Sequence, residues 1–326
     1  MTTLEAAAWG DPDVTRLWAE QQAELAARYD GVADIEADLA PDGALANLVA
    51  FDDDRAPVGC GLLRDLGGGL GELKRMYVVP THRGRGVSRP ILRELERRAR
   101  EASLERLVLE TGVRQPEAIR LYRSAGYTQI PNYGPYEHEP MSVCFGKDLV
   151  VRRVLVISGT ICAGKTWIAA AISDLLIERA VPHARIDVDE LCQVWPTPPG
   201  DTYADELAFA NISAIAPNLA ERGLSSVVLA RVVGDEGDRA RYAAAFGGAA
   251  VTIVRLVVSE ATRRARVLLR EPDGAWQDWG LARTVELEGI LDRLALDDLL
   301  VENDGRPAAE VAAEVLERAG WSHTAG

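Results

Sequence analysis

The sequence has few of the residues that mark a secreted or metal-stabilised domain. Its four cysteines, at positions 60, 144, 162 and 192, form no CxxC pair and have no histidine at metal-ligand spacing. This spacing favours free thiols in a reducing compartment over a disulfide framework or a zinc site. The N-terminus shows no signal-peptide pattern, and no apolar run approaches the ~20 residues of a membrane-spanning helix. We therefore expect a soluble cytoplasmic protein without membrane partners.

Positive charge is also scarce. Lys and Arg number 36 against 50 Asp and Glu, which gives a formal net charge of −14. Because proteins that coat nucleic acids are usually basic, we expect no nucleic-acid partner. An anionic ligand must instead meet a local basic cluster. Apolar residues make up 48% of the 326 positions, which is ordinary for globular proteins, and this length predicts two domains.

The first 149 residues predict an α+β domain. Helical composition comes first, then strand-like runs separated by turn signals, and then alternating strands and helices. We place a domain boundary between residues 149 and 150, with almost no linker. The predicted helices are 17–29 (continuing near 35–39), 91–101 and 116–124, and the predicted strands are 45–51, 57–63, 71–79, 106–110 and 142–147.

Residues 150–326 follow a different pattern. The run 151–158 is almost continuously apolar, as expected of a strand buried on both faces of a parallel sheet. The strands and helices after it alternate, which predicts a doubly wound α/β domain. The predicted strands are 151–158, 184–188, 226–232, 251–257 and 299–301, and the predicted helices are 166–179, 204–222, 260–270, 282–296 and 308–319.

A basic, glycine-containing loop lies between a strand and a helix of the first domain. It reads Arg83-Gly84-Arg85-Gly86-Val87-Ser88. The glycines allow turn geometry and close approach of a ligand, and successive backbone N–H groups at a helix start can converge on phosphate oxygens. A solvated surface loop is the alternative. In its setting between strand and helix, the loop predicts a pyrophosphate site.

Three segments in this order resemble the GNAT family of N-acetyltransferases: ELKRMYVVP at 72–80, the RGRG loop at 83–86, and EAIRLYRSAGY at 117–127. The resemblance covers roughly residues 1–149. It implies a mixed, mostly antiparallel sheet, acetyl-CoA as cofactor, and acetyl transfer to an amine. Ser88 and Gln115 depart mildly from the family pattern, and both remain compatible with cofactor binding. The implied cofactor-binding residues are Val78, Arg83, Gly84, Arg85, Gly86, Val87, Ser88 and Gln115.

The same resemblance implies two catalytic residues. Tyr122 matches the position whose phenol protonates the departing CoA thiolate, a plausible role because a thiolate leaves poorly without an acid. The alternative for Tyr122 is a core aromatic residue of an amphipathic helix. Glu72 matches a position often used as the base that deprotonates the amine. The alternative for Glu72 is a strand carboxylate paired with Lys74 or Arg75.

A second phosphate-binding motif, GTICAGKT, occupies residues 159–166, between an apolar strand and an alanine-rich helix. Its glycines allow the loop to wrap phosphates with backbone N–H groups. Lys165 is expected to reach the β/γ oxygens, and the Thr166 hydroxyl to join the Mg²⁺ shell. This P-loop predicts binding of ATP and Mg²⁺. The predicted nucleotide-binding residues in it are Gly159, Thr160, Ala163, Gly164, Lys165 and Thr166.

Two further segments add candidate chemistry. Asp187 and Asp189 end the second strand, at the ligand-binding edge of a parallel sheet. We expect one carboxylate to bind or orient Mg²⁺ through water and the other to accept the proton of an attacking hydroxyl. Asp187, with Thr166, is the candidate metal ligand, and Asp187, Asp189 and Lys165 are the candidate catalytic residues. The alternative is that Asp189 caps a helix. Helix 260–270 carries Arg266 and Arg270, which either face the phosphates or form a solvated surface.

These features resemble small P-loop kinases of the adenylylsulfate kinase, chloramphenicol phosphotransferase and zeta-toxin type, over residues 151–321. One departure is clear: strand 226–232 ends in Ala-Arg-Val, where a Walker B acid would be expected. Metal binding would then fall on Thr166 with Asp187 and Asp189, or on Asp235.

The favoured hypothesis is a bifunctional enzyme. One half would acetylate a small amine, and the other would phosphorylate a small-molecule hydroxyl with ATP, both acting on one metabolite or antibiotic-like compound. Two alternatives stay open: the P-loop half binds nucleotide only to regulate the acetyltransferase, or one half is an inactive scaffold for a protein partner. The acceptors are not specified by the sequence, and a homodimer is left open.

Overall fold

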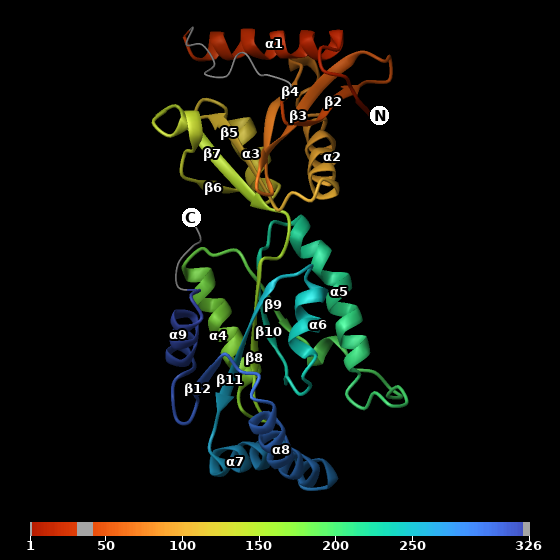
Figure 1. Cartoon of the computed structure of the whole chain (residues 1–326). Helices are drawn as coiled ribbons and strands as arrows, with labels where there is room; N and C mark the ends of the chain where they lie inside the picture. Colours follow the sequence, from red (N-terminus) through yellow and green to blue (C-terminus); the bar gives the residue numbers. More distant parts are fainter. Residues whose placement is uncertain (1, 31–41, 322–326) are drawn as a thin grey trace. The chain divides into compact units, whose positions relative to one another are not determined.

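The computed structural model describes residues 2–30 and 42–321 (Figure 1). The helical continuation predicted near 35–39 lies outside these residues. Contacts between Cα atoms separate the chain into two compact units, unit 1 up to Leu149 and unit 2 from Val150 onward. Each unit has a hydrophobic core of its own. Across the described ranges, no helix combines the length and the apolar character needed to cross a membrane.

Unit 1 is an α+β unit built on a seven-stranded sheet. Its described elements are β1 (Thr3–Ala6), α1 (Pro12–Arg28), β2 (Ala44–Phe51), β3 (Pro57–Gly67), β4 (Leu70–Val78), η1 (Pro80–His82), α2 (Ser88–Glu101), β5 (Arg106–Gly112), α3 (Pro116–Ser124), β6 (Thr128–Ile130), η2 (Gly134–Tyr136) and β7 (Ser142–Asp148). The strand order is β1-β2-β3-β4-β5-β7-β6, and only β4 and β5 pair in parallel. The sheet is therefore mixed and mostly antiparallel, as predicted. Helix α1 packs on one face, and α2 and α3 pack on the other (Figure 1).

β4 and β5 pair over only part of their lengths. Their ladder runs from Leu70↔Arg106 to Leu73↔Leu109, although both strands continue further. The register of β4 against β3 also shifts, and Arg75 in β4 adopts a positive φ of 54°. Such a bulge bends a strand and increases its local twist. The second half of β4 is thereby freed from β5, and the cavity of unit 1 lies beside it.

A close approach between α2 and β3 fixes the start of α2. A Cβ atom at Gly61 of β3 would lie 2.8 Å from Ile91 Cγ2 and 2.7 Å from Met76 Sδ. Any larger residue would push the helix away from the sheet. Gly61 therefore positions α2, and with it the basic loop that leads into α2.

Unit 2 is a doubly wound α/β unit with five parallel strands in the order β12-β11-β8-β10-β9. Its described elements are β8 (Arg153–Ser158), α4 (Lys165–Glu178), β9 (Ala184–Asp187), η3 (Asp189–Leu191), α5 (Asp205–Glu221), β10 (Ser226–Ala230), α6 (Asp238–Ala245), β11 (Ala250–Val257), α7 (Glu260–Arg270), α8 (Ala275–Leu294), β12 (Leu299–Glu302) and α9 (Ala308–Arg318). Most predicted bounds of unit 2 are shifted by one or two residues, and the largest shift is in the helix predicted at 282–296, which already begins at Ala275. The strand predicted at 226–232 ends at Ala230.

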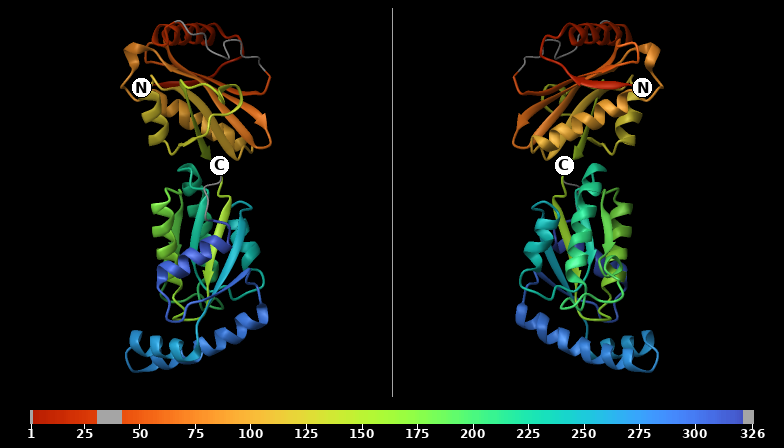
Figure 2. Two further views of the ribbon diagram at one scale, coloured as in Figure 1. Left: turned by 90° about the vertical axis from the view of Figure 1, so that its left-hand side faces the viewer. Right: turned by 90° about the vertical axis from the view of Figure 1, so that its right-hand side faces the viewer.

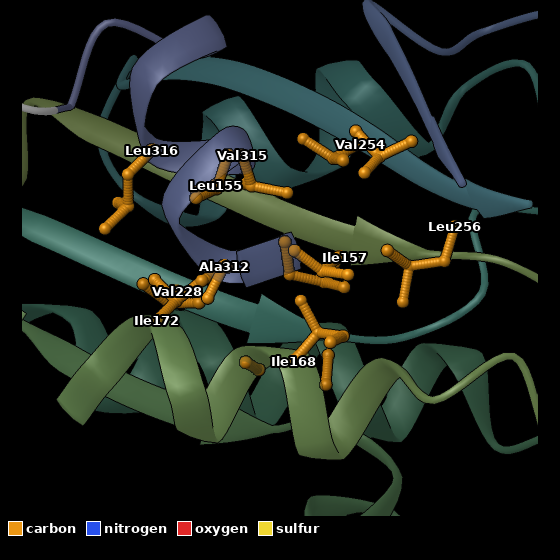
Figure 3. Packing of buried hydrophobic residues seen from close by; sticks show 14 of the residues in the cluster. Leu155, Ile157, Ile168, Ile172, Val228, Val254, Leu256, Ala312, Val315 and Leu316 are labelled. Carbon is orange, nitrogen blue, oxygen red and sulfur yellow. The ribbon is translucent and has the colours of Figure 1, made fainter. Parts of the chain in front are cut away.

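The central strand β8 is buried on both faces. Leu155 and Ile157 point into the core formed with α4 and α9, while Val154 and Val156 point into the core formed with α5 and α6. Figure 3 shows the first of these cores, in which side chains of α4 and α9 meet those of the strands. This two-sided burial explains why the strand is apolar at every one of these positions.

The connections out of β8 and β10 leave on opposite faces of the sheet. β8 leads into α4 on one face, whereas β10 leads into α6 on the other (Figure 1). In open α/β sheets, ligands bind at the carboxyl ends of strands where the connections diverge in this way. The edge formed by the ends of β8 and β10 is therefore the expected ligand site. Helices α7 and α8 lie at this same end of unit 2 (Figure 2).

Candidate functional sites

A cavity of about 280 Å³ lies in unit 1 beside the free half of β4. Its walls come from α1, β4, the loop before α2, and α3. Arg85 does not line the cavity. The predicted residues that do line it are Val78, Arg83, Gly84, Gly86, Val87, Ser88, Gln115 and Tyr122.

The loop before α2 has the geometry of a phosphate cradle. Gly84 and Gly86 have φ values of 74° and 82°, in the left-handed region that favours glycine. Among the described residues, no backbone carbonyl accepts a hydrogen bond from the N–H groups of residues 84–88. These groups precede and open α2, where a helix N-terminus favours an anion. The residues present therefore fit a pyrophosphate group.

Helix α1 contributes an ion-pair network to this cavity. Glu24 accepts hydrogen bonds from Arg83 Nη1 at 3.0 Å and from Arg28 Nη2 at 2.9 Å. Arg28 also pairs with Glu117 of α3. All four side chains line the cavity. Sequence reasoning did not identify Glu24, Arg28 or Glu117, because only the fold brings α1 and α3 together.

Tyr122 presents its side chain to the cavity from α3. The residue is buried, and its ring packs edge-on against Tyr127 at 5.7 Å and beside Phe145 at 6.3 Å. Burial raises the pKa of its phenol well above the ordinary value, and the charge of Glu110 adds to this effect. The hydroxyl group therefore stays protonated at any physiological pH. Tyr122 is both a core residue and a neutral proton donor beside the cavity.

Glu72 lies away from this cavity, within a polar cluster. Its carboxylate accepts a hydrogen bond from Tyr133 Oη at 2.8 Å. Lys74 Nζ lies 3.5 Å away and Arg64 Nη1 lies 3.6 Å away. The residue is almost fully buried. This arrangement is the paired strand carboxylate considered above as the alternative to a catalytic base.

Unit 2 contains a larger cavity, of about 1370 Å³, at the carboxyl ends of its strands. The predicted residues Gly159, Thr160, Ala163 and Asp187 do not line it. The predicted residues that do line it are Gly164, Lys165, Thr166, Asp189, Arg266 and Arg270, together with Asp235.

The P-loop is held in place from β12 and α7. Asn303 Nδ2 donates to the Ala163 carbonyl at 2.7 Å, and Arg266 Nη1 donates to the Cys162 carbonyl at 3.1 Å. Gly164 has a φ of 98°, and a Cβ atom there would lie 2.7 Å from Asn303 Nδ2. The loop thus needs glycine at this position. Arg266 is committed to the loop itself, so it is no solvated surface residue.

Lys165 folds back onto its own loop. Its Nζ donates to the Thr160 carbonyl at 3.0 Å and lies 3.4 Å from the Gly159 carbonyl. Burial lowers the pKa of this amine, and the nearby carboxylates of Asp189 and Asp187 oppose that shift. Lys165 is only partly buried and lines the cavity, and within the described residues its amine donates to backbone carbonyls. An ammonium group in this setting is well placed to gain from an anionic phosphate.

The candidate magnesium ligands Thr166 and Asp187 are in contact. Thr166 Oγ1 donates to Asp187 Oδ2 at 2.7 Å. Within the described ranges, no group of three or more His, Cys, Asp or Glu side chains is arranged to hold a metal. Mg²⁺ is commonly held by one or two carboxylates together with substrate phosphates. The Thr166–Asp187 pair therefore fits Mg²⁺ that arrives with a nucleotide.

Many residues that line the larger cavity were not predicted as site residues, and four of them matter most here. Trp167, Tyr203 and Trp279 line it with exposed rings, and Arg231 follows β10 at the place of the expected Walker B acid. Arg231 Nη1 lies 3.1 Å from Asp189 Oδ1. The position of Arg231 at the end of a strand beside β8 was a usable signal, since strand ends at this edge carry the site.

Comparison with known proteins gives a family for unit 1. Residues 9–127 match the sequence model described as the acetyltransferase (GNAT) family. An IAA acetyltransferase from Azospirillum brasilense is 46% identical over 93 residues, which cover 28% of this chain and 61% of the relative. The uncharacterized N-acetyltransferase YsnE of Bacillus subtilis is 34% identical over 93 residues, 28% of this chain and 62% of that protein.

A solved structure from Klebsiella pneumoniae, assigned as an acyl-CoA N-acyltransferase, is 32% identical. It covers 45% of this chain and 97% of its own, with a TM-score of 0.41. The chain spans about three fifths of the length of the two curated relatives. The matched residues lie within unit 1, on the elements from α1 to α3. Unit 1 therefore carries a domain of the GNAT acetyltransferase family.

Proposed function

We propose that unit 1 transfers an acetyl group from acetyl-CoA to a small amine. The observation that carries this proposal is the loop 83–88, whose backbone N–H groups open α2 beside a cavity that also contains Tyr122. Acetyl-CoA, when bound, supplies an activated thioester. The family of the domain supports the same reaction.

Different residues of unit 1 would bind the cofactor and carry out the proton transfers of this reaction. The N–H groups of residues 84–88 bind the pyrophosphate, and the side chains of Val78 and Gln115 border the rest of the cofactor. Tyr122 holds a proton for the departing thiolate. As the C–N bond forms and the C–S bond breaks, Glu72 stays the predicted acceptor of the amine proton, directly or through water. Its carboxylate is positioned by Tyr133, Lys74 and Arg64.

For unit 2 we propose ATP-dependent phosphorylation of a small-molecule hydroxyl. The P-loop precedes α4 at the switch point of the parallel sheet, and Lys165, Thr166 and Arg270 face one large cavity. Mg²⁺, when bound with ATP, neutralises phosphate charge; Thr166 and Asp187 would hold it. Asp189 would accept the proton of the attacking hydroxyl.

The walls of the larger cavity suggest the charge of the acceptor. Basic side chains come from the P-loop, α7, α8 and the segment after β12, where the phosphates of ATP would lie. Two more, Arg231 and Arg241, pair with acidic side chains on the opposite wall. Acidic side chains come from η3, the start of α5 and the loop after β10. Because like charges repel, the acidic wall disfavours a phosphorylated acceptor and suits a neutral or amine-bearing one. The acidic residues on that wall are Asp189, Asp201, Asp205, Glu206, Asp235 and Asp238.

One screen tests both proposals. The full chain is incubated with panels of amines and alcohols, with acetyl-CoA or with Mg·ATP added separately, and products are identified by mass spectrometry. We expect a gain of 42 Da, about the mass of one acetyl group, with acetyl-CoA, and of 80 Da, about the mass of one phosphoryl group, with ATP. Amino alcohols should be phosphorylated in preference to nucleoside monophosphates.

Variants separate the two activities. Lys165→Ala should abolish phosphorylation and leave acetylation unchanged, whereas Asp174→Asn, an exposed carboxylate on α4, should change neither activity. If ATP binds but no acceptor is phosphorylated, the regulatory hypothesis for unit 2 replaces the kinase proposal. If the chain acetylates none of the amines in the panels, the proposal for unit 1 is wrong.

A further inference from the structure

A buried arginine occupies the place where an acidic residue was expected. Arg231 immediately follows β10, next to the end of β8, and only 5% of its surface is exposed. An acid there would help to hold Mg²⁺. A fixed cation at this position repels a metal ion, so Arg231 must contribute in another way.

The contacts of Arg231 show what the residue contributes to the site. Nη1 donates to Asp189 Oδ1 at 3.1 Å and to Cys192 Sγ at 3.0 Å. Nη2 donates to the Tyr203 carbonyl at 3.2 Å and to Asp205 Oδ1. A guanidinium group has five N–H donors, so these four acceptors leave at most one for a ligand. Two carboxylates also neutralise its charge. Arg231 is therefore not free to bind a substrate phosphate.

The four partners of Arg231 belong to two separate segments. Asp189 and Cys192 lie just after β9, whereas Tyr203 and Asp205 lie at the start of α5. Between them runs the segment 193–202, in which Trp195 is 91% exposed. Arg231 joins the two ends of this segment to the sheet. The Asp201 carboxylate also holds the end of the segment next to α5, because it accepts hydrogen bonds from the backbone N–H groups of residues 205 and 206.

We propose that Arg231 is a positioning residue: it fixes Asp189 and the start of α5, which line one wall of the larger cavity, and so holds the segment 193–202 at both ends. This inference rests on the proposed kinase function. Arg231 stands where a Walker B acid was expected, and its role differs from the metal binding of that acid. Arg231 orders the acceptor side of the cavity, and metal binding is left to Thr166 and Asp187.

The test compares Arg231→Gln, Arg231→Lys and Arg239→Gln in the full chain. Arg239 is a matched control: it donates to the carboxylate of Asp298 and to two carbonyls, but does not line the cavity. Hydrogen–deuterium exchange is measured on peptides covering residues 189–205. The affinity for ATPγS is measured by calorimetry, and kcat and KM for ATP are measured with an acceptor found in the screen.

Arg231→Gln should speed exchange over residues 189–205 by about tenfold or more, since it removes hydrogen bonds to two charged groups. The affinity for ATPγS should stay within about twofold, because at most one N–H donor of Arg231 is left for a ligand and two carboxylates neutralise its charge. kcat should fall about a hundredfold with KM for ATP unchanged, as expected when geometry at the reacting groups is lost. Arg231→Lys should recover part of the protection and of kcat, and Arg239→Gln should change none of these values.

Unchanged exchange in Arg231→Gln would overturn the proposal. A fall of more than about tenfold in ATPγS affinity with unchanged exchange would also overturn it, by making Arg231 a phosphate ligand. If Arg231→Gln fails to fold, Arg231→Lys and Asp205→Asn test the proposal instead. Both variants should show faster hydrogen–deuterium exchange over residues 203–205. If the wild-type chain phosphorylates nothing, the kinase proposal fails, while the exchange and affinity data still decide the role of Arg231.

Discussion

Tyr122 illustrates how burial sets the chemistry of a single side chain. The aromatic packing that places Tyr122 in the core of unit 1 also removes water from its phenol, which raises the pKa above the ordinary value of 10. A raised pKa means that the neutral, proton-bearing form persists as the pH increases. If Tyr122 is the proposed acid for thiolate departure, its proton is therefore available across the whole neutral and mildly alkaline range.

Tyr122→Phe should lower kcat for acetyl transfer by about a hundredfold, since a positioned general acid typically contributes at least that factor. The dissociation constant for acetyl-CoA should change little, because the ring remains. Tyr127→Phe is the matched control, as Tyr127 is equally buried and does not line the cavity. CoA release measured with a thiol reagent gives the rates. Equal turnover in wild type and Tyr122→Phe would remove Tyr122 as the acid.

The cysteines differ in their access to reagents. Cys60, Cys144 and Cys192 are buried, and burial raises the pKa of Cys60 to about 12. Cys162 is partly exposed in the P-loop and lines the larger cavity. Burial raises the pKa of Cys162 as well. Because the thiolate is the reactive form, its alkylation should accelerate as the pH rises.

We expect iodoacetamide to label Cys162 first in the native protein, and the other three cysteines only after unfolding. Mg·ATP should slow labelling of Cys162 if the nucleotide occupies the loop as proposed. Peptide mass spectrometry over a time course measures both effects, with Cys162→Ser as the control for site assignment. Labelling of Cys162 at the same rate with and without saturating nucleotide would argue against ATP at the P-loop.

At the scale of the elements, the long and strongly patterned segments were predicted correctly. The apolar run 151–158 contains strand β8 (Arg153–Ser158), and residues 116–124 form α3. The short edge strands β1 and β6 were missed, because three or four mostly exposed residues carry no readable hydrophobic alternation. Helix α6 was also missed, and the start of α8 was placed too late. Exposed Trp276 and Trp279 hide the helical periodicity at that start.

The two-sided burial of β8 predicts a large effect of a core substitution. Leu155→Ala should lower the free energy of unfolding of unit 2 by about 2–5 kcal/mol, because the Leu155 side chain of β8 is fully buried against α4 and α9. Leu300→Ala on β12 is the matched control: Leu300 is 54% exposed, and the loss should be within about 0.5 kcal/mol. Denaturant unfolding of the full chain measures both values.

Leu155→Ala should leave the affinity of unit 1 for acetyl-CoA unchanged, since the two units have separate cores. A parallel loss of acetyl-CoA binding would show that the units are energetically coupled. A loss below about 1 kcal/mol would mean that the site relaxes to fill the space left by the side chain.

Across the whole molecule, the local motifs were predictable and their surroundings were not. The positions of both loops that we propose to bind phosphate follow from spacing, glycine content and a strand–loop–helix setting. The partners that complete each cavity come from distant segments: Glu24 and Arg28 approach the first loop from α1, and Asn303 and Arg266 hold the second from β12 and α7. Arg231 depends on partners 26–42 residues away in sequence. Such contacts arise only from the tertiary fold.

The central claim is that one chain carries two independent sites, one for acetyl-CoA and one for nucleotide. Isothermal titration of the full chain with acetyl-CoA and with Mg·ATPγS, each alone and each after saturation with the other, tests it most directly. We predict one site for each ligand, both still present when the other ligand is bound. Lys165→Ala should remove only the nucleotide site. Competition between the two ligands, or absence of either site in the wild-type chain, would contradict the account.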